Sequence, residues 1–232
     1  MSRLLLTIAL IFGTTSCAVL DDLARTSQPG TQPSEARIAE GLREALRVGS
    51  SRASDRVGRL DGYLGNELIK IALPDSVQQA AVQLRRVGLG RQVDELELAM
   101  NRAAESAARE AVEVFADAIA RMRPADVYAV FRGDEDAATR YLRTTSEPVL
   151  RERYQPIVGE HLERVQGMAL YREIATTWNR LPRVQPLDVD LDRHVTEQAL
   201  DGLFLVLAEE ERRIRTDPAA RTTRLLREVF SD

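Results

Sequence analysis

Hydrophobic residues recur every three or four positions along most of the chain, and this is the spacing of one face of an α-helix. The pattern is clearest between about residue 91 and residue 122, where a continuous stripe predicts one long helix. The stripe consists of Val93, Leu96, Met100, Ala103, Ala107, Ala111, Val114, Ala118 and Met122. Its alanine-rich centre allows a neighbouring helix to approach closely. We therefore predict an all-α fold, an irregular multi-helix bundle of about eight or nine helices.

Polar residues in front of the apolar stripes predict where the helices begin. Ser34 is the expected N-cap of the first helix, and Ser76 with Gln79 has the spacing of a capping box. Asp192 and Asp217 are the expected N-caps of two later helices, the second running to about Phe230. Pro148 is expected at the start of a helix, because proline is tolerated in the first turn.

One stretch, "DGYLGNELIKIALP" at residues 61–74, departs from the helical pattern. Asp61-Gly62 and Gly65-Asn66 are turn dipeptides. Ile69, Ile71 and Leu73 then alternate with polar or small residues. We therefore predict a short extended arm that ends at Pro74.

The N-terminus has the features of an export signal. Arg3 precedes an apolar run from Leu4 to Phe12, too short to span a bilayer core, which requires about 20 residues. The run leads through small residues to Ser16 and Cys17, the only cysteine in the sequence, and this resembles the lipobox of bacterial lipoproteins.

We accordingly predict three segments: a lipoprotein signal peptide at 1–16, a lipidated N-terminus and flexible tether at 17–33, and a single helical domain at 34–232. Acylation of Cys17 would anchor the protein to a membrane rather than make it span one. Ala18 follows the cysteine where aspartate would signal retention. By resemblance to enteric lipoproteins, this favours the inner leaflet of the outer membrane, facing the periplasm.

Charge and composition narrow the expected partners. The chain has 32 basic and 36 acidic residues, a net charge of −4. This mild acidity argues against nucleic acid, for which a basic surface is expected. Cys17 has no partner for an internal disulfide.

Familiar catalytic and metal-binding motifs are missing from the sequence. His161 and His194 are the only histidines, and neither follows a glutamate by three positions, as a di-metal helical bundle requires. Asp188, Asp190 and Asp192 resemble the start of a calcium loop, but the glycine and glutamate that complete it are absent. We therefore predict no catalytic residue, metal or cofactor.

Two polar clusters remain as candidates for binding. Arginines interleave with carboxylates near the C-terminus, and a second cluster interrupts the alanine-rich helix. The candidate residues are Asn101, Arg102, Glu105, Asp201, Arg213, Arg215, Asp217 and Arg221. One interpretation is a solvated surface of ion pairs, and the other is an arginine cluster that binds a carboxylate or phosphate group.

Four stretches carry a resemblance to a known family: "DGYLGNELIKIALP", "LGRQVDELELAMNRAAE", "GDEDAATRYLR" and "VTEQALDGLF...AEEERRIRTDPAARTTRLLREVF". Together they resemble the bacterial family catalogued as domain of unknown function 4197, from about Leu42 to Phe230. The resemblance implies a secreted or lipoprotein-like, all-helical protein, and it transfers no activity or catalytic residue.

Two functional hypotheses follow. The first is a non-enzymatic module that binds an envelope partner or an apolar ligand. The alternative is an enzyme acting on a lipid or cell-wall fragment through the arginine corner with Glu105 or Asp201.

Overall fold

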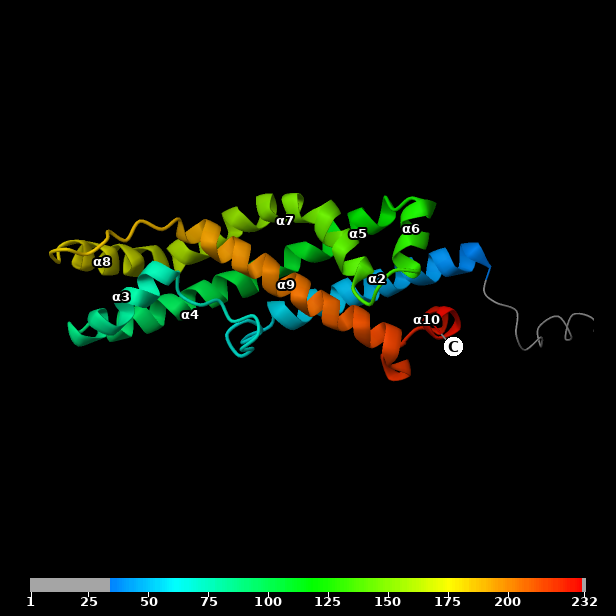
Figure 1. The fold of residues 1–232 in the computed structure, drawn as a ribbon, viewed down its shortest axis with the longest axis horizontal. Coiled ribbons are helices and arrows are strands. Elements are labelled where there is room, and N and C mark those ends of the chain that lie inside the picture. The colour runs from blue at the N-terminus through cyan, green and yellow to red at the C-terminus, as the bar shows by residue number, and fades with distance from the viewer. Residues whose placement is uncertain (1–33, 231–232) are drawn as a thin grey trace, which may run out of the picture. The chain divides into compact units, whose positions relative to one another are not determined.

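The computed structural model describes residues 34–230, and helices joined by short loops make up most of them (Figure 1). The α-helices are α2 (Glu35–Gly58), α3 (Asp75–Arg86), α4 (Gly90–Ala107), α5 (Ala111–Ala120), α6 (Pro124–Phe131), α7 (Ala137–Arg164), α8 (Gly167–Asn179), α9 (Leu191–Thr216) and α10 (Arg224–Val229). Two 3-10 helices, η1 (Ala108–Glu110) and η2 (Pro218–Ala220), join some of them. The predicted all-α bundle is confirmed, since no strand occurs within residues 34–230.

Three long helices, α2, α7 and α9, form the frame of the bundle. α9 makes its most extensive contacts with α7 and α2, and α4 packs against α7. Figure 1 shows α9 crossing the other helices, with α3, α4 and α8 near its start and the short helix α10 beside α2.

The core is continuous and consists of the apolar stripes predicted from the sequence. Tyr63, Tyr154, Phe115 and Phe204 are its largest fully buried side chains. Phe115 and Phe204 meet edge to face, with 5.8 Å between ring centroids. This ring contact joins α5 to α9, and burial of the two rings stabilises it.

A smaller apolar cluster seats α10 against α2. Ala45, Ile214, Ala220 and Leu226 form it. Thr223 caps α10, because its hydroxyl accepts a hydrogen bond from the Leu226 amide at 3.2 Å. The expected last helix from Asp217 to Phe230 is thus divided into η2 and α10.

The predicted helix start at Pro148 is wrong. α7 runs without interruption for 28 residues and contains both Pro148 and Pro156. Leu142 and Leu150, on either side of Pro148, are completely buried. Their packing offsets the backbone hydrogen bond that proline cannot make.

Two of the predicted caps, and the length of one helix, also require correction. α3 begins at Asp75 with Pro74 in the capping position and no side-chain cap, so the Ser76 capping box does not form. Asp190, rather than Asp192, caps α9 by accepting the Arg193 amide at 3.0 Å. The long helix expected from 91 to 122 is broken by η1, where the Tyr154 hydroxyl donates to the Ala108 carbonyl.

Asp192 instead lies in the first turn of α9, against Gly159 of α7, where a β-carbon would come within 3.0 Å of its carboxylate. Its Oδ1 atom is buried and has no hydrogen-bond partner. Burial, followed by repulsion from Asp190 and Glu163, raises the pKa of Asp192. The charged form is therefore disfavoured in the folded protein relative to the unfolded chain.

This environment predicts that Asp192→Asn increases the free energy of unfolding at pH 7. Both states of the wild type carry the charge there, and only the folded state bears the cost of burying it. The gain should shrink as the pH falls through the raised pKa of Asp192 toward its ordinary value. Urea unfolding of both proteins at pH 7 and pH 4 measures this, and an equal or greater gain at pH 4 would contradict it.

The predicted signal peptide, Cys17 and the tether lie outside the described residues, so those statements stay predictions. Within residues 34–230, no helix is long and apolar enough to cross a membrane.

Candidate functional site

The arm, defined here as residues 59–74, is the longest non-helical segment between two helices in residues 34–230. Turns form residues 60–69, and an irregular extended stretch completes the arm at 70–74. Asp61 has a φ of 60°, and a β-carbon on Gly62 would lie 2.3 Å from the Val57 carbonyl oxygen. The turn dipeptide recognised in the sequence is therefore required by the backbone at this point.

Asn101 of α4 holds the extended part of the arm. The Ile71 amide donates to Asn101 Oδ1 at 2.9 Å, and Asn101 Nδ2 donates to the Ile71 carbonyl at 2.9 Å. The same Nδ2 atom donates to the Glu97 carbonyl at 2.8 Å. Asn101 and Ile71 are both completely buried, so the side-chain amide replaces the neighbouring strand that this extended backbone lacks.

Glu105, one turn further along α4, holds the turns. It is 5% exposed and accepts the Tyr63 amide at 3.2 Å and the Leu64 amide at 3.4 Å. Arg102 donates to Glu105 at 2.6 Å and to Asp61 at 2.8 Å, and so joins the helix to the turn. These hydrogen bonds and the ion pair with Arg102 offset the cost of burying the Glu105 side chain.

Tyr63 fixes the arm to α9. Its ring is completely buried, and its hydroxyl donates to the Ala199 carbonyl at 2.6 Å. Burial, with a smaller contribution from the Glu105 charge, raises the pKa of Tyr63 well above its ordinary value. The phenol thus stays protonated and keeps its role as a donor.

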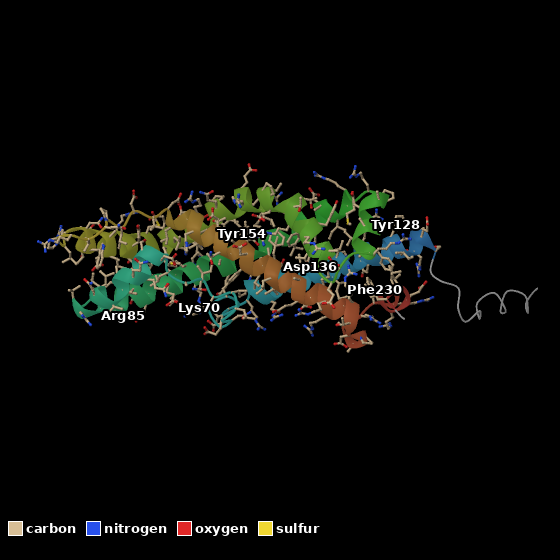
Figure 2. The ribbon with its side chains drawn as sticks, in the orientation of Figure 1. Lys70, Arg85, Tyr128, Asp136, Tyr154 and Phe230 are labelled. Carbon is tan, nitrogen blue, oxygen red and sulfur yellow. The ribbon has the colours of Figure 1, made fainter. Side chains whose placement is uncertain are left out.

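The outer side of the arm presents two leucines among charged residues, since Arg59, Asp61 and Glu67 are exposed there as well. Leu60 and Leu68 are each 73% exposed, the highest values among the large exposed hydrophobic residues of the described chain. The alternation predicted for Ile69, Ile71 and Leu73 is present, since all three are buried and point away from solvent. Lys70 forms an ion pair with Glu97 at 3.0 Å and marks the end of the turns (Figure 2).

Gly202 of α9 lies under the arm and makes this packing testable. A β-carbon at Gly202 would come within 2.8 Å of the Tyr63 ring and 3.0 Å of Ile69. Gly202→Ala should therefore lower the free energy of unfolding by about 1–3 kcal/mol, despite alanine's better helix propensity. Gly49→Ala is the matched control, because its β-carbon would meet only Ile214, at 3.6 Å. Denaturant unfolding should show a lower free energy of unfolding for Gly202→Ala, and little change or an increase for Gly49→Ala. A decrease of similar size in both variants would contradict the packing described here.

The arginine corner predicted near the C-terminus divides into structural and exposed residues. Arg215 donates to Glu211 at 2.9–3.0 Å and to the Val130 carbonyl at 3.0 Å. Arg221, 8% exposed, donates to the Ile214 carbonyl at 3.1 Å and to the Arg215 carbonyl at 2.8 Å. Both guanidinium groups are thus directed into the fold. Arg221 satisfies carbonyls at the end of α9, and Arg215 satisfies a carbonyl at the end of α6.

Glu211 completes this arrangement by capping α7. It accepts the amides of Ala138 at 3.0 Å and Thr139 at 2.8 Å, and also the Thr139 hydroxyl at 2.8 Å. The remaining arginine of the corner, Arg213, is 57% exposed and pairs with Glu210 at 3.0 Å.

The eight candidate residues do not form one site. Asn101, Arg102 and Glu105 hold the arm, whereas Asp217 caps η2 through the Ala219 amide at 2.9 Å. Asp201 pairs with Arg143, whose guanidinium lies 5.3 Å from the Phe204 ring centroid. The helical rise of about 1.5 Å per residue puts Asp201 about 21 Å from Arg215 along α9.

The two histidines have different surroundings. His194 Nε2 lies 3.1 Å from the Ala72 carbonyl, at the end of the arm. Burial lowers the pKa of His161, and neither of its ring nitrogens has a hydrogen-bond partner. No group of three or more His, Cys, Asp or Glu side chains within residues 34–230 is arranged to hold a metal ion.

Sequence reasoning missed Tyr63 and Asp61 as members of the cluster. A signal was present: Asn101 and Glu105 lie four positions apart on the buried face of a helix, so each requires a partner. A nearby non-helical segment with free backbone groups, such as residues 61–74, is the natural source of such partners.

These observations define an all-α protein in which buried polar side chains fix one irregular segment in place. The chain belongs to the family described as "Protein of unknown function (DUF4197)", whose model matches residues 32–231. No curated protein and no solved structure matches the chain.

Proposed function

We propose that the chain is a lipid-anchored, non-enzymatic binding module of the bacterial cell envelope, facing the periplasm, which holds a protein partner through the arm. The observation that carries this proposal is the contrast between the two sides of the arm. Its inner side is fixed by buried polar groups, and its outer side presents Leu60 and Leu68 to solvent.

The fixed inner side supports the proposal because it is energetically costly. Burying a carboxylate such as Glu105 and a side-chain amide such as Asn101 is unfavourable unless every polar atom is satisfied. A shorter connection between α2 and α3 would not need them. Polar groups and a positive φ concentrated at one surface segment are typical of a site kept for function.

The exposed outer side supports a protein partner. Two leucines on a rigid segment bind with little loss of conformational entropy, which favours them as anchors of an interface. Large hydrophobic side chains are otherwise best placed in the core.

The closed interior favours binding at the surface. A narrow cavity between α2 and α9, beside Leu42, Leu207 and Phe230, holds about 20 Å³. That volume admits roughly one water molecule, whereas ligand pockets have about 300–1,000 Å³. An apolar ligand would therefore fit this cavity only if the core opened.

The enzymatic alternative receives no comparable support. Arg215 and Arg221 are occupied by internal carboxylate and carbonyl oxygens, and Asp201 lies far from them along α9. Replacing both arginines is expected to unfold the end of α9 rather than to remove an activity from an intact fold.

Site-specific photocrosslinking tests the interface. A photoreactive residue at position 68, in the full chain expressed in a Gram-negative host, should give a discrete adduct with an envelope protein. The same residue at Val82, which is 60% exposed on α3, is the matched control and should not. Leu60→Ser should weaken the adduct at 68. Identical products from positions 68 and 82, or an adduct at 68 that Leu60→Ser leaves unchanged, would contradict the proposal.

Metabolic labelling with a fatty-acid analogue tests the anchor separately. The wild type should incorporate the label, and Cys17→Ser should not, because it removes the only thiol. An unlabelled wild type would remove the anchor from the proposal and leave the arm surface to be judged by crosslinking.

A further inference from the structure

A second surface feature lies where α2 and the first residue of the arm, Arg59, pass the end of α9. Four arginines, three from residues 52–59 and one from α9, line an open groove of about 490 Å³. The groove is lined in part by Arg52, Asp55, Arg56, Arg59, Glu210 and Arg213. We call it the arginine groove.

The carboxylates around the arginine groove neutralise only two of its arginines. Arg56 pairs with Glu209 at 2.8 Å and lies 3.6 Å from Glu210. Arg213 pairs with Glu210 at 3.0 Å. The Asp217 carboxylate accepts the Ala219 amide and so is used as a cap.

The other two arginines, Arg52 and Arg59, form no ion pair with a carboxylate of the described residues. Arg52 donates to the Ala220 carbonyl at 3.1 Å and to the Thr222 hydroxyl at 3.0 Å, and both acceptors are neutral. Arg59 is exposed, and no carboxylate of the described residues lies within ion-pair distance of it. Asp55, exposed on α2, is the one lining carboxylate without an ion pair or a capping role among the residues described.

We propose that the arginine groove binds a phosphate group, carried by an anionic lipid headgroup or by a small soluble phosphate ester. Guanidinium groups bind phosphate oxygens through paired, charge-assisted hydrogen bonds. Arg52 is held in place by its neutral partners, so it is preorganised to receive an anion. Arg59, the first residue after α2, is free to close on the anion, and Asp55 opposes binding.

This arrangement predicts effects of opposite sign at neighbouring positions between residues 52 and 59. Arg59→Gln should weaken phosphate binding several-fold, and Arg52→Gln with Arg59→Gln should weaken it at least about tenfold. Asp55→Asn should tighten binding, because it removes the opposing charge. Arg164→Gln is the matched control, since Arg164 is 65% exposed and pairs with Glu160 on α7.

The test uses the full chain with Cys17→Ser, so that no acyl chain contributes to membrane binding. Inorganic phosphate is titrated by calorimetry, and vesicles of phosphatidylglycerol or phosphatidylcholine are tested by co-sedimentation. Binding of phosphate and of phosphatidylglycerol vesicles, but not phosphatidylcholine vesicles, supports the proposal with a lipid source. Saturable binding of phosphate alone supports it with a soluble ester as the source.

Three outcomes would overturn the proposal. They are no binding of either probe, equal binding by Arg59→Gln and the Arg164→Gln control, or weaker binding by Asp55→Asn. Because Arg52 also contacts Ala220 and Thr222, circular dichroism of each variant checks the fold, and Arg59→Gln gives the result that does not depend on those contacts.

Discussion

Asn101→Ala is expected to lower the free energy of unfolding by about 2–4 kcal/mol, because it leaves the buried amide and carbonyl of Ile71 without partners. Each unsatisfied buried group costs about 1–3 kcal/mol, and the gain in helix propensity from alanine is smaller than 1 kcal/mol. Urea unfolding followed by circular dichroism measures the change. Gln78→Ala, on the exposed face of α3, is the control for a lost amide and should change stability little.

Asn101→Asp distinguishes a hydrogen-bonding role from simple space filling. The aspartate retains the acceptor for the Ile71 amide, but its charged form would face the Ile71 and Glu97 carbonyls without a donor. The variant should therefore be destabilised at pH 7 and recover in part at acidic pH, where a protonated carboxyl can donate. If alanine and aspartate were both tolerated as well as asparagine, Asn101 would not hold the arm.

The second large effect is expected at Arg215. Its side chain is 15% exposed and pairs with Glu211, which is 9% exposed. Removing one partner of a buried pair costs about 3–5 kcal/mol, and Arg215→Leu should lie near the lower end because Glu211 keeps the amides of Ala138 and Thr139. Thermal and denaturant unfolding are the measurements.

Arg213→Leu is the matched control, two residues away on the same helix. Arg213 is 57% exposed, and Glu210 retains Arg56 as a partner when it is removed. The expected loss is below about 1 kcal/mol. Equal losses at 213 and 215 would mean that the corner is not divided into structural and exposed arginines as described.

The different roles of Arg213 and Arg215 show what the sequence could and could not predict. Helical spacing places Arg215 one turn from Glu211, and a pair at this spacing is expected. Which of the two arginines faces the core depends on where α6 and α7 lie, because Val130 and the amides of residues 138 and 139 complete the contacts. No local pattern contains that information.

The arm also shows that contacts between residues far apart in the sequence cannot be predicted from a local pattern. Its turns and its alternation of buried residues were predicted from local chemistry, and the polar cluster at Asn101 and Glu105 was recognised as unusual for an alanine-rich helix. The hydrogen bonds between the arm and these two side chains were not predicted. Ile71 and Asn101, for example, are 30 positions apart and meet only after α3 and α4 have packed. The arginine groove was missed for the same reason, because α2 and α9 contribute to it from distant parts of the chain.

Pro148 shows where a sound local rule fails. A proline ordinarily marks the first turn of a helix, yet α7 continues through it. Tertiary packing on both sides of the proline decided the outcome, and only the neighbouring helices determine that packing.

Amide hydrogen exchange in the arm tests the central claim most directly, namely that a non-helical segment is held rigid to present Leu60 and Leu68. The amides of Ile71, Tyr63 and Leu64 should exchange only through openings close in free energy to global unfolding, because Asn101 and Glu105 accept them. Leu68, whose amide donates to Asn66 within the exposed turn, is the internal reference and should exchange faster. If the amides of Ile71 and Tyr63 exchange as fast as that of Leu68, the arm is not held as described and the proposed interface loses its basis.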